Sequence, residues 1–120
     1  MTRKATVLTR AGCGIEAHPV HVECHLAGGL PGTTVVGLAE GAVKEARGRV
    51  KSAIRNSGFQ YPTSHITLNL APSHLTKSGT AFDLPIAIAI LAASEQIPAQ
   101  ALLDTEFLGE LSLFGDLRET

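Results

Sequence analysis

The chain has 120 residues, of which 44% are hydrophobic, with ten basic and eleven acidic side chains and a formal net charge of -1. This length suits one domain and is too short for a complete ATP-driven motor, a two-domain dehydrogenase or a β/α barrel, which need about 200 residues or more. The balanced charge excludes a DNA-binding module built on a large basic excess, so any nucleic-acid contact must be local. Two cysteines are too few for a disulfide scaffold, and the longest apolar run, residues 84–93, is too short to cross a membrane. We expect a cytoplasmic domain, or a piece of a larger protein, with no membrane partner.

The first third of the chain predicts three β-strands. Ala5–Arg10 is extended in character and ends before Gly12, which we expect to break the strand. Ile15–Leu26 alternates apolar and polar residues from its middle onward, which is typical of a half-buried strand. A loop rich in glycine and proline, residues 28–32, leads to the β-branched run Thr33–Val36.

From Leu38 to Asn56 the apolar period becomes helical and predicts an amphipathic helix. Small alanines in its apolar stripe would let it lie close to a sheet. The stripe consists of Ala42, Val43, Ala46, Val50, Ala53 and Ile54. Alternation returns over His65–Ala71, which predicts a further strand.

The last third predicts a second helix over Phe82–Glu95, apolar almost all round and therefore buried, with Thr80 or Asp83 as its N-cap. A short helical turn over Ile97–Leu103 and a hairpin over Glu106–Arg118 follow. This order predicts an α+β fold, an α/β sandwich in which helices pack on one face of a mixed sheet.

A basic stripe on the first helix is the most concrete candidate for binding. Its members fall within about 80° of arc beside the apolar face, where they can contact phosphates. They are Lys44, Arg47, Lys51 and Arg55. Glu40 lies on the same stripe four residues before Lys44, and Glu45 precedes Arg49 by four, so a solvated, salt-bridged face is the alternative. With only Phe59 or Tyr61 near the helix end, the pattern argues against a base-stacking platform.

A polar loop before the second helix is a candidate anion site. Free amides at a helix N-terminus and the side chain of Lys77 can hold an anion, together with Ser78, Gly79 and Thr80. The alternative is an ordinary capped loop. Because Thr76 stands where a P-loop has glycine, this is no Walker A motif.

Neither a metal site nor a nucleophile is indicated. His18, His21, Glu23 and His25 have conceivable ligand spacing, but solvent-facing polar residues are expected on a half-buried strand, so we predict no metal. The possible nucleophiles Cys24, Ser78 and Thr80 and the possible bases His65, His74 and Lys77 share no spacing signature.

Several blocks spread over the whole chain carry a family resemblance. They are Gly29-Leu30-Pro31-Gly32, Val36-Gly37-Leu38, Val43-Lys44-Glu45-Ala46-Arg47, Ser52-Ala53-Ile54, Ser57-Gly58-Phe59, Ile66-Thr67-Leu68-Asn69-Leu70-Ala71-Pro72 and Phe82-Asp83-Leu84-Pro85-Ile86-Ala87. In combination they resemble the N-terminal region of the ComM/YifB family, magnesium-chelatase-like AAA+ proteins of bacteria. The resemblance implies a Lon-protease-like, ribosomal protein S5 domain 2-like fold, which agrees with the predicted element order.

The resemblance also implies a larger protein. Family members continue into an ATPase module that uses ATP and Mg²⁺, and competence-related members resemble a ring-forming, hexameric helicase that drives branch migration in recombination. We therefore expect a single noncatalytic N-terminal domain over residues 1–120, without a cofactor of its own. Its expected partners are its own ATPase domain, neighbouring protomers and single-stranded or branched DNA.

The relation to Lon raises a peptidase as the alternative. Aligning Lys77 with the family pattern lysine, aspartate, glycine, proline, serine, alanine places Ala81 at the nucleophilic serine, and a methyl group cannot attack a carbonyl. We therefore expect no peptidase activity. A purely structural oligomerisation domain is the third possibility.

Overall fold

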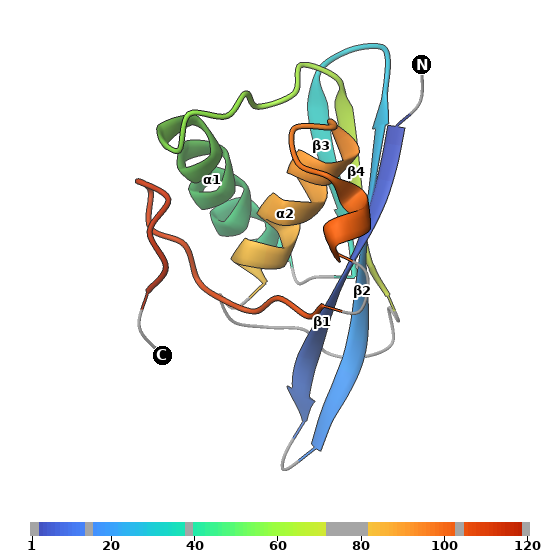
Figure 1. Cartoon of the computed structure of the whole chain (residues 1–120), viewed down its shortest axis with the longest axis vertical. Helices are drawn as coiled ribbons and strands as arrows, with labels where there is room; N and C mark the ends of the chain where they lie inside the picture. The colour runs from blue at the N-terminus through green and yellow to red at the C-terminus, as the bar shows by residue number, and fades with distance from the viewer. Residues whose placement is uncertain (1–2, 14–15, 38–39, 72–81, 103–104, 119–120) are drawn as a thin grey trace.

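The computed structural model describes residues 3–13, 16–37, 40–71, 82–102 and 105–118 (Figure 1). Along the chain the elements are β1 (Arg3–Cys13), β2 (Glu16–Ala27), β3 (Gly32–Val36), α1 (Glu40–Asn56), β4 (His65–Ala71), α2 (Asp83–Ala93) and the 3-10 turn η1 (Ala99–Leu102). The predicted α+β class is confirmed.

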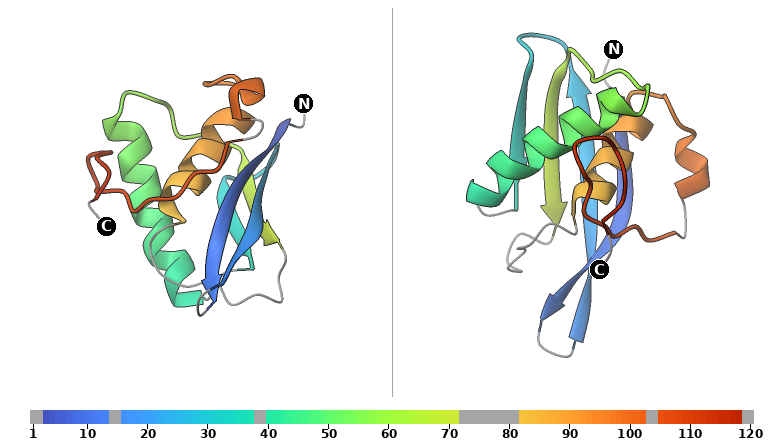
Figure 2. Two further views of the ribbon diagram at one scale, coloured as in Figure 1. Left: turned by 60° about the horizontal axis from the view of Figure 1, so that its bottom comes forward. Right: turned by 90° about the vertical axis from the view of Figure 1, so that its left-hand side faces the viewer.

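The four strands form one mixed sheet in the order β1-β2-β4-β3. β2 pairs antiparallel with both β1 and β4, whereas β3 lies parallel to β4. Parallel neighbours need a crossover rather than a tight turn, and α1 forms that crossover between β3 and β4. Both helices cover the same face of the sheet, as predicted (Figure 2).

The first two strands form a ribbon that extends beyond the rest of the sheet. β4 pairs only with His21–Ala27 of β2, so the far end of the ribbon projects past the helices (Figure 1). The strand break predicted at Gly12 is wrong, because Gly12 pairs with Ala17 and β1 continues to Cys13. Glycine weakens a strand without preventing its ladder of backbone hydrogen bonds.

The core lies between the sheet and the helices. The alternation predicted for the second strand is confirmed, with its apolar residues buried and its polar residues exposed on the opposite face. The buried residues of β2 and β4 are Val20, Val22, Cys24, Leu26, Ile66, Leu68 and Leu70. The buried stripe of α1 consists of Ala46, Val50, Ala53 and Ile54, while the side chains of Ala42 and Val43 lie outside the described part.

The second helix is central, as its apolar sequence predicts. Nine of its 11 residues are buried. Within the described ranges, no helix has the length and apolar character needed to cross a membrane. Asp83 does not cap the helix as predicted: Phe82 holds the N-cap position and makes no side-chain cap hydrogen bond. The other predicted cap, Thr80, lies outside the described residues.

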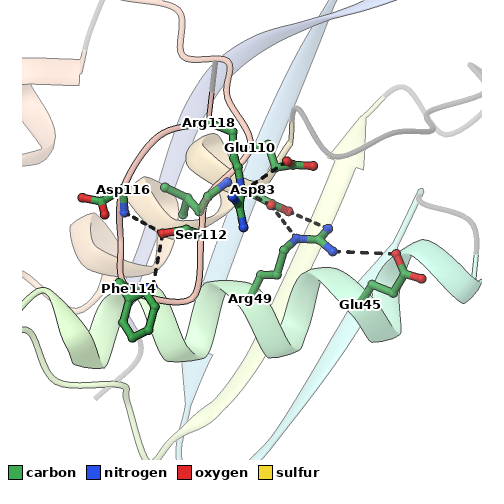
Figure 3. A network of polar contacts seen from close by, with 9 residues as sticks. Glu45, Arg49, Asp83, Glu110, Ser112, Phe114, Asp116 and Arg118 are labelled. Atoms are coloured by element: carbon green, nitrogen blue, oxygen red, sulfur yellow. Dashed lines mark hydrogen bonds and ion pairs between the residues drawn. The ribbon is translucent and has the colours of Figure 1, made fainter. Parts of the chain in front are cut away.

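Asp83 instead forms an ion pair with Arg49 that joins the two helices (Figure 3). Arg49 Nε and Nη2 donate to the two carboxylate oxygens at 2.7 and 3.1 Å, and the backbone N–H of Leu111 donates to Oδ2 at 3.2 Å. Because the aspartate is only 1% exposed, these donors replace the water that it loses on folding. The hydrogen bond to Asp83 is the main cause of the raised pKa of Arg49.

The C-terminal part follows the prediction in outline. The helical turn expected over residues 97–103 is present as η1. The hairpin expected over residues 106–118 is a tight turn closed by a single antiparallel bridge between Leu111 and Leu117, without regular strands. Gly115 at its tip has a φ of +92° and lies directly against the last turn of α1, so a side chain has no room there.

Two glycines allow a matched test of this fold. Gly37 has a φ of +91°, and a Cβ there would collide with the carbonyl oxygen of Leu70, whereas a Cβ at Gly48 in α1 would meet no atom within 4 Å. We expect Gly37→Ala to lower the free energy of unfolding by about 1–3 kcal/mol. Gly48→Ala should raise it by about 0.5–1 kcal/mol, since alanine favours helix. Urea denaturation of both variants is the measurement, and equal effects of the two would contradict this packing.

Candidate nucleic-acid interface

One flank of α1 presents the basic stripe predicted from the sequence. At about 100° per residue, its positions follow one another along the helix directly beside the buried stripe. All four side chains are exposed, and all four line one open groove of about 540 Å³. They are Lys44, Arg47, Lys51 and Arg55. Their clustering is therefore established, and their role in binding stays a prediction.

Two segments form the opposite wall of this groove. The start of β3, with the proline before it, contributes Pro31–Thr33, and the connection from α1 to β4 contributes Tyr61–Ser64. The hydroxyl oxygens of Thr33 and Tyr61 lie 3.3 Å apart, within hydrogen-bonding distance, which links the two segments. The wall thus combines an aromatic ring with aliphatic hydroxyl groups, facing a wall of cations.

A glutamine at the end of α2 holds the longer of these segments. The backbone N–H of Gln60 donates to Gln96 Oε1 at 2.8 Å, and Gln96 Nε2 donates back to the carbonyl of Gln60 at 2.7 Å. The same amide nitrogen lies 2.9 Å from Ser94 Oγ. This two-point contact resembles the pairing of two strands and anchors the chain next to Tyr61.

Within the part of the chain that the structure describes, no acidic side chain balances the charge of the groove. No carboxylate of this part lines the groove, and its ion pairs use other cations, namely Arg10, Arg49 and Arg118. The predicted salt-bridged face exists on the other flank of α1, where Arg49 lies 3.7 Å from Glu45. The side chain of Glu40 lies outside the described part. Like charges held together on a rigid helix favour an anionic ligand.

Tyr61 is a groove residue that the sequence indicates only as an isolated aromatic near the end of the helix. The ammonium nitrogen of Lys51 lies 5.4 Å from the centroid of its ring, within the range of a cation–π contact. The scarcity of aromatic residues argues against a stacking platform, yet the one tyrosine of the chain lies in the groove wall. Its place depends on the contact between its hydroxyl group and Thr33, and on the hydrogen bond between the preceding residue, Gln60, and Gln96. Both contacts join residues that are distant in sequence.

The predicted anion loop does not enter this geometry. Lys77, Ser78, Gly79 and Thr80 fall within residues 72–81, outside the described part of the chain. The same holds for Ala81, the residue aligned with the Lon nucleophile. The anion site and the loss of the nucleophile therefore remain predictions.

The histidines of β2 do not converge. His21 and His25 lie on the exposed face of the sheet with Glu23, but four residues of strand separate them by about 13 Å. A zinc ion binds nitrogen at about 2.0–2.1 Å, so the two cannot share one ion without a large rearrangement. Glu23 accepts a hydrogen bond from Asn69 Nδ2 at 2.8 Å. No group of three ligating side chains able to hold a metal occurs among the described residues.

Cys24 is an inert thiol and no catalytic nucleophile. It is 2% exposed, and burial raises the pKa of the thiol to about 12, so it stays protonated at neutral pH. The possible base His65 lies on the opposite face of the sheet. Ser78, Thr80 and His74 lie outside the described residues.

Comparison with known proteins places the chain among magnesium-chelatase-like proteins. A family model described as subunit ChlI of Mg-chelatase matches residues 22–120. The chain is 59% identical to the uncharacterized protein YifB of Escherichia coli over 93% of its own length, and 54% identical to the competence protein ComM of Haemophilus influenzae over 95%. It spans 22% of the length of each of these relatives. An uncharacterized protein of Mycobacterium tuberculosis is 40% identical over 88% of the chain and is covered over 21% of its own length. These identities confirm the resemblance that the sequence blocks indicate.

The buried thiol gives a direct test of the sheet. In a Cys13→Ser variant, which leaves Cys24 as the one thiol, we expect a disulfide reagent at about pH 8 to react only as fast as the protein opens, and quickly in urea. The free energy of unfolding should fall between about pH 8.5 and pH 12, because the unfolded chain releases a thiol proton that the folded chain keeps. Rapid labelling of the native protein would contradict the burial of Cys24.

Proposed function

The chain belongs to the family of subunit ChlI of Mg-chelatase, and on this premise we propose that it is a noncatalytic domain that contacts nucleic acid within a larger ATPase. The observation that carries the proposal is the groove beside α1, which four cationic side chains line and which contains no carboxylate in the described part of the chain. Phosphates are the ligands that such a groove suits best, because each phosphate that a cation neutralises releases counterions into solution.

The rest of the domain supports this role by its rigidity. α1 is fixed on its core side by buried apolar residues and on its far flank by the ion pair between Arg49 and Asp83. The cations therefore stand on an element that does not have to order itself when a ligand binds, which favours affinity. The segment of the opposite wall that contains Tyr61 is anchored by two hydrogen bonds between the side chain of Gln96 and the backbone of Gln60.

The activity of the whole protein is part of the proposal, since the chain spans about a fifth of the length of YifB and ComM. We propose that the whole protein is a cytoplasmic ATPase that uses ATP and Mg²⁺ in a separate domain and assembles as a ring, expected to be a hexamer. The name of ComM, competence protein, favours a role in handling single-stranded or branched DNA during uptake and recombination, including branch migration. This domain would hold DNA near the motor and contact neighbouring protomers.

Charge reversal in the groove tests the DNA contact. We expect Arg47→Glu combined with Lys51→Glu to weaken the binding of single-stranded or branched DNA at least tenfold at low salt. The dependence of log affinity on log salt should become shallower by about 1.4, since each lost single-strand phosphate contact removes about 0.7. Fluorescence anisotropy with labelled DNA over a salt series measures both quantities.

The matched control changes the net charge equally elsewhere. Lys4→Glu alters one exposed cation that does not line the groove, and it is compared with Arg47→Glu alone. Lys4→Glu should leave the affinity within about threefold, since distant exposed charges are screened. If Lys4→Glu and Arg47→Glu weaken binding to the same extent, or if neither does, the groove is not the contact. A domain that binds no DNA but is needed for ring assembly would replace the proposal with a purely structural role.

A further inference from the structure

We infer that the groove receives one strand of nucleic acid, with a base stacked against Tyr61, rather than a duplex. This inference rests on the proposed function and names the ligand of the same site. Three features of the groove carry it: its concave shape, the length of its cationic wall, and the aromatic ring in the wall opposite.

The shape of the site excludes a duplex from its floor. The cations face a hollow of about 540 Å³ whose other wall is made by Pro31–Thr33 and Tyr61–Ser64. A helix that reads duplex DNA must itself enter a groove about 12 Å wide, so it has to stand clear of its neighbours. Here the start of β3 and the connection from α1 to β4 face the cationic flank of α1 across the hollow. A duplex can therefore reach only the rim, whereas one sugar-phosphate backbone can lie between the walls.

The cationic wall has the length of a short stretch of strand. Lys44 and Arg55 are separated by eleven residues of α1, which corresponds to about 16 Å at 1.5 Å per residue. Arg47 and Lys51 lie between them, so cations recur every three or four residues along the groove. Such a row follows a backbone for a few phosphates, in keeping with single-strand sites of about 4–16 nucleotides.

The opposite wall supplies what a base needs. Tyr61 lines the groove, and the ammonium group of Lys51 covers its ring at 5.4 Å. Stacking of a base on an aromatic ring is stronger than an exposed cation–π contact. A bound strand can therefore displace Lys51 from the ring to a phosphate while a base takes its place. In this exchange Lys51 gains a phosphate and the ring of Tyr61 gains a base, so neither group is left without a contact.

The ring is also held in position before a strand arrives. The hydrogen bonds between Gln60 and Gln96 anchor the residue preceding Tyr61, and the phenol lies 3.3 Å from the hydroxyl oxygen of Thr33. A base that stacks on a ring fixed in this way does not have to order the loop. Hydroxyl groups on the same wall, from Thr63 and Ser64, can contact the backbone without reading sequence.

The test measures the binding of three probes of equal length to the whole 120-residue chain. The probes are an oligothymidylate of about 12 nucleotides, the corresponding abasic strand, and a duplex. This length lies within the range of known single-strand sites. We expect the thymidylate to bind about tenfold more tightly than the abasic strand and than the duplex. Tyr61→Leu should remove the advantage over the abasic strand. Tyr61→Phe keeps the ring and loses only the phenol contact, so it should retain that advantage.

The abasic strand separates folding from stacking. A Tyr61→Leu variant that binds the abasic strand as the original chain does has kept its groove, and its loss of the thymidylate advantage then supports the inference. If the duplex and the thymidylate bind with equal affinity, and the double variant Arg47→Glu with Lys51→Glu weakens the binding of both, the single-strand inference is overturned and the proposed function still stands. Binding of every probe that is insensitive to that charge reversal would overturn both.

Discussion

The ion pair between Arg49 and the buried Asp83 sets the orientation of α1, and the groove depends on that orientation. Taking Val50 as the centre of the buried stripe, Arg49 lies about 100° to one side and the four groove cations lie about 60–140° to the other. Fixing Arg49 against a carboxylate that is 1% exposed therefore turns the opposite flank toward the segments that form the second wall. The backbone N–H of Leu111 donates a hydrogen bond to the same carboxylate, so the C-terminal segment takes part in the same constraint.

The two flanks of one helix thus have different electrostatic roles. On one flank, Arg49 is neutralised by Asp83 and approached by Glu45, and its charge serves the fold. On the other, four cations share a groove that no carboxylate lines among the residues that the structure describes. The net charge of -1 gives no sign of this separation, because a sum over the whole chain does not say where each charge lies. A chain with a balanced composition can therefore present a locally cationic surface, and the structure assigns that surface to one flank of α1, which faces the uncharged segments Pro31–Thr33 and Tyr61–Ser64.

Much of this was predictable from local patterns, and the rest depended on distant contacts. Period-two alternation located β2 and β4, and the helical period located α1 together with its cationic flank, because each repeat reflects the geometry of its own element. The role of Asp83 was not predictable: an aspartate at a helix start ordinarily indicates a cap, and its partner is 34 residues away. The same holds for Tyr61, whose position is set by Thr33 and by the loop that Gln96 anchors. Gly12 failed as a strand break because pairing with β2 outweighs its low propensity.

The central claim is that nucleic acid lies in the groove beside α1, and residue-resolved mapping tests it most directly. Amide resonances of the isotope-labelled domain would be followed in solution while a short oligothymidylate is added. The account predicts that the largest shift changes lie on α1 between Lys44 and Arg55 and in Tyr61–Ser64, and that they diminish with added salt. Changes confined to the exposed face of the sheet around His21 and His25, with none along α1, would contradict it.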